Sequence, residues 1–238
     1  MTGIESCGPV TALTLGLPST TAIPAGRGRL PKEGFYRNAH VTARLRRRFV
    51  DDVTTFVMLA QINERSTGIP AGVTVQQIYV LGVDANTTTP DTAMLEHLAR
   101  YFDEQSKHHA RILFAWIHGD DVTLAVYRNA NVREGLAEGA VYTGDTDFAA
   151  AVSIRLDGSD LDIAWDAICA RIILGGDEPA HLDRRIAVKR RFAELDKEIV
   201  RLTKAHAKAA QIVRRNELWN QLQEARSKRR EMERDTLA

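Results

Sequence analysis

The sequence predicts an α+β protein: a small mixed β-sheet with packed helices, followed by a long C-terminal helix or a coiled-coil-like helical hairpin. Two observations lead to this prediction. Helical and strand periodicities alternate through the middle of the chain. The last glycine and proline are Gly176 and Pro179, so nothing beyond Ala180 breaks a helix. We therefore expect an N-terminal extended basic arm (1–40), an α+β body (41–178) and a C-terminal helical segment (179–238).

The body begins with a predicted helix over residues 42–62. Its apolar residues recur at helical spacing and share one face: Leu45, Phe49, Val53, Phe56, Val57 and Ala60. Arg44, Arg47 and Arg48 lie on the opposite face. Residues 73–83 have the composition of a strand.

The second half of the body continues the alternation. A helix is expected after Thr89 as N-cap, with Pro90 at its first position. Strands at 110–118 and 122–128 flank a Gly-Asp-Asp turn and predict a hairpin. Further on we expect a strand at about 148–156 and a helix at about 160–174, which Gly175 and Gly176 end.

The C-terminal segment carries an apolar seam of coiled-coil type, with steps of four and three residues. The seam comprises Val188, Phe192, Leu195, Ile199 and Leu202. It weakens at His206 and Ala209 and resumes in a shifted phase at Ile212, Trp219 and Leu222, so a stutter or a fold-back is expected near 205–210. Such a seam needs a partner, which is the body, its own second half or another chain.

Composition and charge bound the class of protein. Of 238 residues, 44% are apolar and 26% charged, as in globular proteins. From Arg184 onward there are 16 basic and 8 acidic residues, which leaves 16 of the 32 basic and 23 of the 31 acidic residues before it. A tail of charge +8 indicates an acidic partner, either protein or nucleic acid, although a solvated helix has the same composition. Without a membrane span or a signal peptide in the sequence, we expect a cytoplasmic protein.

Glycines and basic residues gather in AGRGRLPKEGFYRN, residues 25–38. The stretch raises the question of a phosphate cradle, but GRG does not continue into GxGxxG, and the chain has no GxxxxGK[ST]. We interpret it as an extended arm, kept out of helical geometry by Pro24 and Pro31 and anchored by Phe35 and Tyr36. The candidate nucleic-acid contacts on the arm and the first helix are Arg27, Arg29, Lys32, Arg44, Arg47 and Arg48.

No catalytic motif is present. The chain lacks HExxH, GxSxG and deaminase signatures, and no lysine follows an acidic residue at the spacing that PD-(D/E)xK nucleases use. The two cysteines, Cys7 and Cys169, form no CxxC pair. We predict no catalytic residue, metal ligand or cofactor. A nuclease site assembled by the fold from Asp84, Asp120 and Asp121 remains an alternative.

Several short motifs occur in an order that resembles the domain of unknown function 4391 family. They are LGLP (15–18), LPKEGFY (30–36), NERSTGIP (63–70), RILFAWIHGDDVTLAVYR (111–128) and QIVRRNELWNQL (211–222). The resemblance implies an accessory protein without established catalysis. It further implies a gene beside those of ATP-dependent helicases and DNA methyltransferases, in a restriction-modification-like, phage-defence gene island.

We therefore expect a non-catalytic accessory subunit that binds a helicase or a DNA methyltransferase through its helical tail. The candidate partner-binding residues are Phe192, Leu195, Ile199, Leu202, Ile212, Leu218, Trp219 and Leu222. Two alternatives stay open: a nucleic-acid-binding module that contacts phosphates through its basic arm and helix, and a metal-dependent nuclease.

Overall fold

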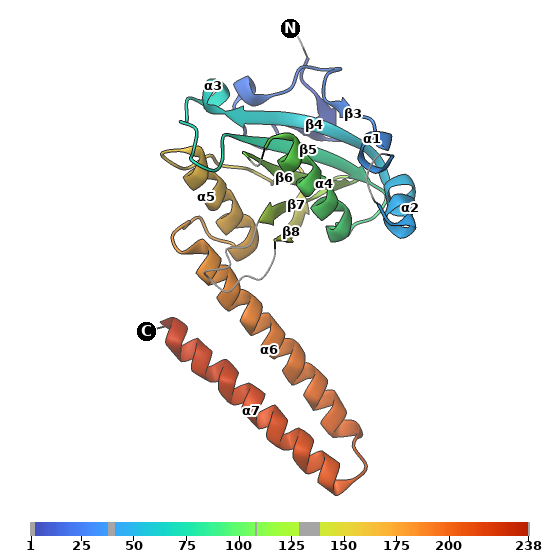
Figure 1. The fold of residues 1–238 in the computed structure, drawn as a ribbon, viewed down its shortest axis with the longest axis vertical. Coiled ribbons are helices and arrows are strands. Elements are labelled where there is room, and N and C mark those ends of the chain that lie inside the picture. The colour runs from blue at the N-terminus through green and yellow to red at the C-terminus, as the bar shows by residue number, and fades with distance from the viewer. Residues whose placement is uncertain (1–2, 38–40, 108, 129–138, 238) are drawn as a thin grey trace. The chain divides into compact units, whose positions relative to one another are not determined.

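The computed structural model describes residues 3–37, 41–107, 109–128 and 139–237, and it divides the chain into two compact units (Figure 1). The first unit, called the body below, extends to Leu182. The second, the C-terminal unit, begins at Asp183, four residues beyond the predicted boundary. Each unit has an apolar cluster of its own.

A six-stranded mixed sheet forms the centre of the body, in the order β3-β4-β5-β6-β7-β8. The strands are β3 (Arg29–Leu30), β4 (Val53–Asn63), β5 (Gln77–Ala85), β6 (Ala110–His118), β7 (Asp121–Arg128) and β8 (Ala140–Phe148). Strands β5 and β6 are parallel because helix α4 (Thr92–Gln105) returns the chain between them, whereas the other neighbouring pairs are antiparallel. The predicted α+β class with a mixed sheet is confirmed, as is the hairpin of β6 and β7.

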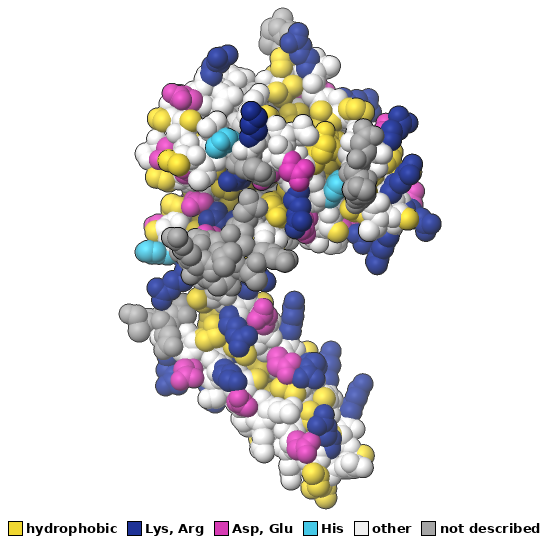
Figure 2. Space-filling model, viewed as in Figure 1, with side chains coloured by type: hydrophobic (Ala, Val, Ile, Leu, Met, Phe, Trp, Pro, Cys, Tyr) yellow, Lys and Arg dark blue, Asp and Glu magenta, His cyan; other side chains and the backbone are white. Residues whose placement is uncertain are grey.

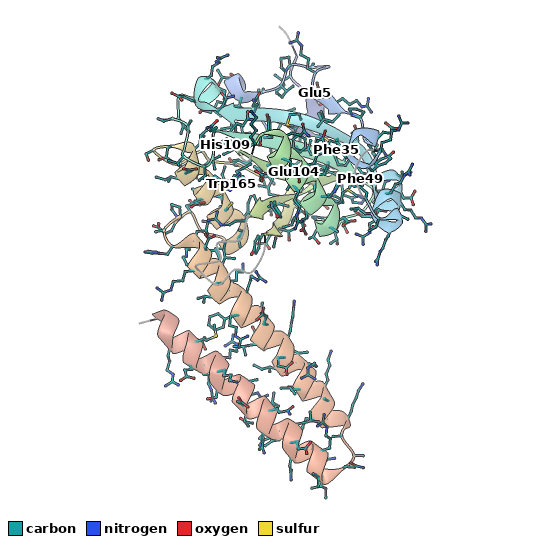
Figure 3. All side chains as sticks on the ribbon, viewed as in Figure 1. Glu5, Phe35, Phe49, Glu104, His109 and Trp165 are labelled. Atoms are coloured by element: carbon teal, nitrogen blue, oxygen red, sulfur yellow. The ribbon has the colours of Figure 1, made fainter. Side chains whose placement is uncertain are left out.

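Helices α1 (Glu33–Tyr36), α2 (Ala43–Asp51) and α4 pack on one face of the sheet. Their core is rich in aromatic side chains, among which Phe35 and Phe49 are labelled in Figure 3. The hairpin of β1 (Ser6–Cys7) and β2 (Val10–Thr11) lies against the other face. There Cys7 approaches Gly82 so closely that a Cβ at Gly82 would lie 2.7 Å from the Cys7 Cβ, which requires a glycine. Helix α5 (Leu161–Leu174) contacts β7 and β8.

The predicted extended arm is wrong, because residues 3–37 belong to the body. Strand β3 pairs with β4, and a 3₁₀ helix, η1 (Ser19–Thr21), precedes Ile23, whose N–H donates to the Leu59 carbonyl at 3.0 Å. Phe35 anchors the stretch in the core as expected. The segment therefore completes the sheet edge rather than extending from the body.

The predicted helix over 42–62 is correct only in its first half. Helix α2 ends at Asp51, and strand β4 begins at Val53. β4 is buried on both faces, so its apolar residues do not alternate and their spacing imitates that of a helix. The β-branched and aromatic residues of VTTFV are the local signal for a strand.

Three further boundaries differ from the prediction. Strand β5 is displaced from 73–83, and α4 has Asp91 rather than Thr89 as its N-cap, with Oδ1 accepting from the N–H groups of Ala93 and Met94. The strand expected at 148–156 is wrong: β8 ends at Phe148, and its glycine and acidic residues hid it from a propensity argument. Helix α5 is confirmed, and Gly175 ends it with a φ of 76°.

The C-terminal unit consists of α6 (Leu182–Lys208) and α7 (Ile212–Leu237), separated at residues 209–211. Leu202 of α6 packs with Leu218, Leu222 and Ala225 of α7. The two helices thus fold back on each other, so the predicted fold-back near 205–210 is confirmed. Coiled-coil packing of the pair stays a prediction.

The body contains one more short helix, α3 (Glu64–Thr67), which follows directly after β4.

Candidate nucleic-acid and protein interfaces

The glycine-rich stretch binds an anionic group, and that group is the chain's own carboxylate. Oε2 of Glu5 accepts hydrogen bonds from the backbone N–H groups of Arg27 (3.1 Å) and Gly28 (3.2 Å). A Cβ at Gly28 would lie 2.3 Å from the Met58 carbonyl oxygen, so only glycine fits beside β4. Figure 3 labels Glu5 at this end of the body. The glycines therefore serve the packing of the N-terminal segment, and both N–H groups are already engaged.

Lys32, a predicted phosphate contact, is turned toward the protein. Its Nζ donates to the carbonyl oxygen of Val53 at 2.6 Å and lies 3.4 Å from that of Val50. These carbonyls stand where α2 gives way to β4, so the ammonium group satisfies backbone acceptors at the junction. Lys32, predicted as a nucleic-acid contact, is therefore engaged by the backbone of its own chain.

Helix α2 presents a basic surface on the body. Thr42 caps the helix, its Oγ1 accepting from the Leu45 N–H, and Phe49 is buried. The opposite side carries exposed Arg44 and Arg47, while Arg46, also exposed, lies nearer Phe49 with its guanidinium 5.5 Å from the Tyr36 ring centre. Figure 2 shows Lys and Arg side chains gathered over α1 and α2. Charge is thus concentrated where the sequence predicted it.

The remaining predicted basic residues differ in their surroundings. Arg48 forms an ion pair with the Asp91 carboxylate at 2.5 Å, so it joins α2 to the N-terminus of α4 and its charge is compensated. Arg29 is exposed, and its backbone pairs with Val57 of β4. Val57 lies about 13 Å along the strand from Val53, the residue at which β4 begins after α2. Arg27, two residues before Arg29, is also exposed. The structure therefore groups Arg44 and Arg47 but does not bring the six candidates into one cluster.

The apolar seam of the C-terminal unit is covered by its own second half. Leu195, Leu202, Leu218 and Leu222 are buried, and Ile199 packs against their cluster. Phe192 lies under the Arg229 guanidinium, 5.6 Å from the ring centre. The expectation that these residues are free to bind a partner is wrong for the four leucines. Of the three alternatives for the seam, the chain's own second half is the one observed.

The turn of the helical hairpin leaves apolar side chains exposed. Ile212 is 74% exposed, Val213 72% and Trp219 47%. Ile212 and Trp219 are seven residues apart and share a side of α7, where the Trp219 ring lies 5.5 Å from that of His206. Figure 2 shows hydrophobic side chains at this turn. We call Ile212, Val213 and Trp219 the tip surface; the sequence missed Val213, which belongs to no heptad position of the seam.

The residues considered for catalysis do not converge. Across the described ranges, no group of three or more His, Cys, Asp or Glu is placed to hold a metal ion, so Asp84, Asp120 and Asp121 form no such cluster. Burial, reinforced by the charge of Asp84, raises the pKa of the Cys7 thiol to about 12. That thiol stays protonated at neutral pH and is not an activated nucleophile. Among the helices described, none is long and apolar enough to cross a membrane.

Comparison with known proteins identifies the family. Residues 15–228 match the domain of unknown function DUF4391, so the chain belongs to this family over most of its length. Neither the curated proteins nor the solved structures yielded a match.

Proposed function

We propose that the protein is a non-catalytic, cytoplasmic accessory subunit of a DNA-defence, restriction-modification-like system. In this proposal it binds an ATP-dependent helicase or a DNA methyltransferase of the same system. The family supplies the context of the proposal. The tip surface supplies the observation that supports it, since its three large apolar residues are exposed together near the turn of a unit whose seam leucines are buried.

The energetic argument concerns which apolar groups remain to be covered. Burying the leucine cluster within the hairpin already stabilises the C-terminal unit, so those residues offer little to a partner. Ile212 and Trp219 gain most from a partner, because their exposed area is large and Trp is an effective anchor in protein interfaces. The partner thus docks at the turn and not along the seam.

The experiment is co-purification of the full-length tagged protein with the helicase and the methyltransferase encoded beside it. We expect capture of one of them, and loss of capture in Ile212→Asp/Trp219→Asp. The matched control is Asn216→Asp/Asn220→Asp, which adds the same charge at exposed polar positions of α7. Failure to capture either enzyme, or equal capture by both variants, contradicts the proposal.

The second candidate is a nucleic-acid-binding module that contacts phosphates through α2. It is favoured by the exposure of Arg44, Arg46 and Arg47 on one short helix. Phosphate contacts position a protein on DNA without reading its sequence, so this function requires no further recognition element. Its test is the salt dependence of DNA binding by a variant that lacks Arg44 and Arg47.

A further inference from the structure

The outer side of α6 carries a regular row of positive charges. Arg190, Lys197 and Lys204 are spaced by seven residues and all are exposed. Seven residues fall about 20° short of two full turns, so the three side chains lie within about 40° of one another around the helix. Lys208 extends the row by one turn. We call these four residues the α6 row.

The row points away from the hairpin partner. Leu195 and Leu202, which are buried in the seam, lie on the opposite side of α6 from Lys197 by helical geometry. Figure 2 shows Lys and Arg side chains projecting from α6 on the side away from α7. Along the helix axis, Arg190, Lys197 and Lys204 follow one another at about 10.5 Å and Lys208 follows at about 6 Å, so the whole row is about 27 Å long.

The neighbouring acidic groups do not compensate these charges. Their partners are other basic residues: Glu194 pairs with Arg191 at 3.2 Å, Glu198 with Arg201 at 2.5 Å and Asp196 with Arg229 at 2.6 Å. In the described part of the chain, no ion pair involves the α6 row. The row therefore presents four exposed positive charges without an ion-pair partner in the described ranges.

Solubility alone does not account for this placement. Through the middle of α7, the side opposite Leu218 and Leu222 carries one charge, Glu224, among the uncharged Asn216, Asn220, Gln223 and Ser227. A solvated hairpin would carry many charges of mixed sign on both outer sides, whereas here the basic residues gather on one side and the other side is mainly neutral. Lys204 and Lys208, four residues apart, also repel each other and disfavour the helix by a few tenths of a kcal/mol.

We propose that the α6 row binds the phosphate backbone of a nucleic acid. Single positive charges repeated along one line suit a polyanion of uniform charge density, and a row of about 27 Å covers about eight base pairs of duplex. A protein partner would require a large anchor among the charges, whereas Ala193 stands between Arg190 and Lys197. Val200, which is 52% exposed, stands between Lys197 and Lys204, but valine is under-represented among such anchors. The α6 row shares no residue with the tip surface or with α2, so it does not depend on the proposed partner.

The test uses the full-length protein and the anisotropy of a labelled duplex, and of a single strand of the same length, over a range of salt concentrations. In Arg190→Ala/Lys197→Ala/Lys204→Ala we expect the slope of log K against log salt to fall by about 3 on duplex, or by about 2 on a single strand. Of the duplex and the single strand, the one for which the triple variant loses more affinity is the preferred nucleic acid. Lys197→Arg/Lys204→Arg should retain the original slope.

The control removes the same charge from another side of the hairpin. Arg226→Ala/Arg230→Ala/Arg234→Ala changes three exposed residues of α7 and should leave the slope unchanged. Equal loss in both triple variants would reduce the effect to net charge and overturn the proposal. Absence of DNA binding at low salt would also overturn it. So would poly-glutamate that displaces the labelled DNA as effectively as unlabelled DNA does, because that result favours an acidic protein.

Discussion

The Nζ of Lys32 donates a hydrogen bond of 2.6 Å to the main-chain carbonyl oxygen of Val53, the first residue of β4. The lysine follows β3, so this contact fastens the edge of the sheet to the point where α2 ends. A charged donor on a main-chain acceptor contributes more than a neutral one. Lys32 is therefore a structural residue of the body.

Lys32→Met should destabilise the body by about 1–3 kcal/mol, because the Val53 carbonyl loses its charged donor. Urea unfolding of the full chain measures this change. The affinity for DNA should remain the same, since the ammonium group is engaged by the Val53 carbonyl. Arg29→Met is the control on the neighbouring strand and should leave stability nearly unchanged. If Lys32→Met instead weakens the affinity for DNA and leaves stability normal, Lys32 contacts phosphate.

Asp162 provides a pH-dependent contribution to stability. Its carboxylate accepts from the backbone N–H groups of Val73, Thr74 and Val75 and from the Thr74 hydroxyl. Burial acts to raise the pKa of Asp162, but these hydrogen bonds outweigh it and hold the pKa below its ordinary value of 3.8. Since the folded pKa is the lower one, this contribution is complete above the unfolded value and is lost as pH falls through the folded one.

We therefore expect Asp162→Asn to cost about 1–3 kcal/mol at neutral pH, with the difference from wild type shrinking as the pH falls below about 4. Chemical unfolding at a series of pH values measures it. Asp160→Asn retains an N-cap oxygen for the Ile163 N–H and serves as the control. If the difference in the free energy of unfolding between Asp162→Asn and wild type is independent of pH, the ionised carboxylate does not provide this contribution.

Gly175 and Phe56 show which parts of the fold could be predicted from the sequence and which could not. Gly175 ends α5 as expected, because a left-handed C-cap is a local requirement that the sequence displays. Phe56 was assigned to a helical face, but its neighbour Val57 is also buried, on a strand enclosed from both sides. Periodicity cannot distinguish such a strand from a helix, since the difference lies in residues distant along the chain.

The candidate interfaces show the same limit. Charge on α2 was predictable because it depends on exposed residues that are close in sequence. Glu5 binds the N–H groups of Arg27 and Gly28 from a distance of more than twenty residues, and no local pattern shows it. Likewise, the seam predicted the need for a partner, but the identity of that partner depended on the turn after Lys208.

Removal of one leucine should affect the C-terminal unit more than the body. Leu222→Ala should destabilise the hairpin by about 2–4 kcal/mol, since Leu222 is buried against Leu202 and Leu218. Hydrogen exchange of the full-length protein, followed in α6 and α7 and separately in β5 and β6, measures this effect. Protection should fall in the helices and persist in the strands. Equal loss in both units would show that they unfold as one.

The arginines of α2 separate DNA contact from structure. Arg44 and Arg47 are exposed, and in the described ranges neither has an ion-pair partner, so their loss should leave unfolding unchanged. If they contact phosphates, Arg44→Ala/Arg47→Ala should reduce the salt slope of duplex binding by about 2. Arg48→Ala should instead reduce stability by about 1 kcal/mol, because it breaks the ion pair with Asp91, with little change in slope.

Anisotropy titrations and urea unfolding of the same two variants give this comparison directly. The α6 row is intact in both variants, so any change in slope belongs to α2 alone. A slope that falls in Arg48→Ala but not in Arg44→Ala/Arg47→Ala would mean that the ion pair with Asp91 opens to admit a phosphate. A slope unchanged in both would leave α2 as a solvated face, because removing an exposed charge that touches no phosphate releases no counterion.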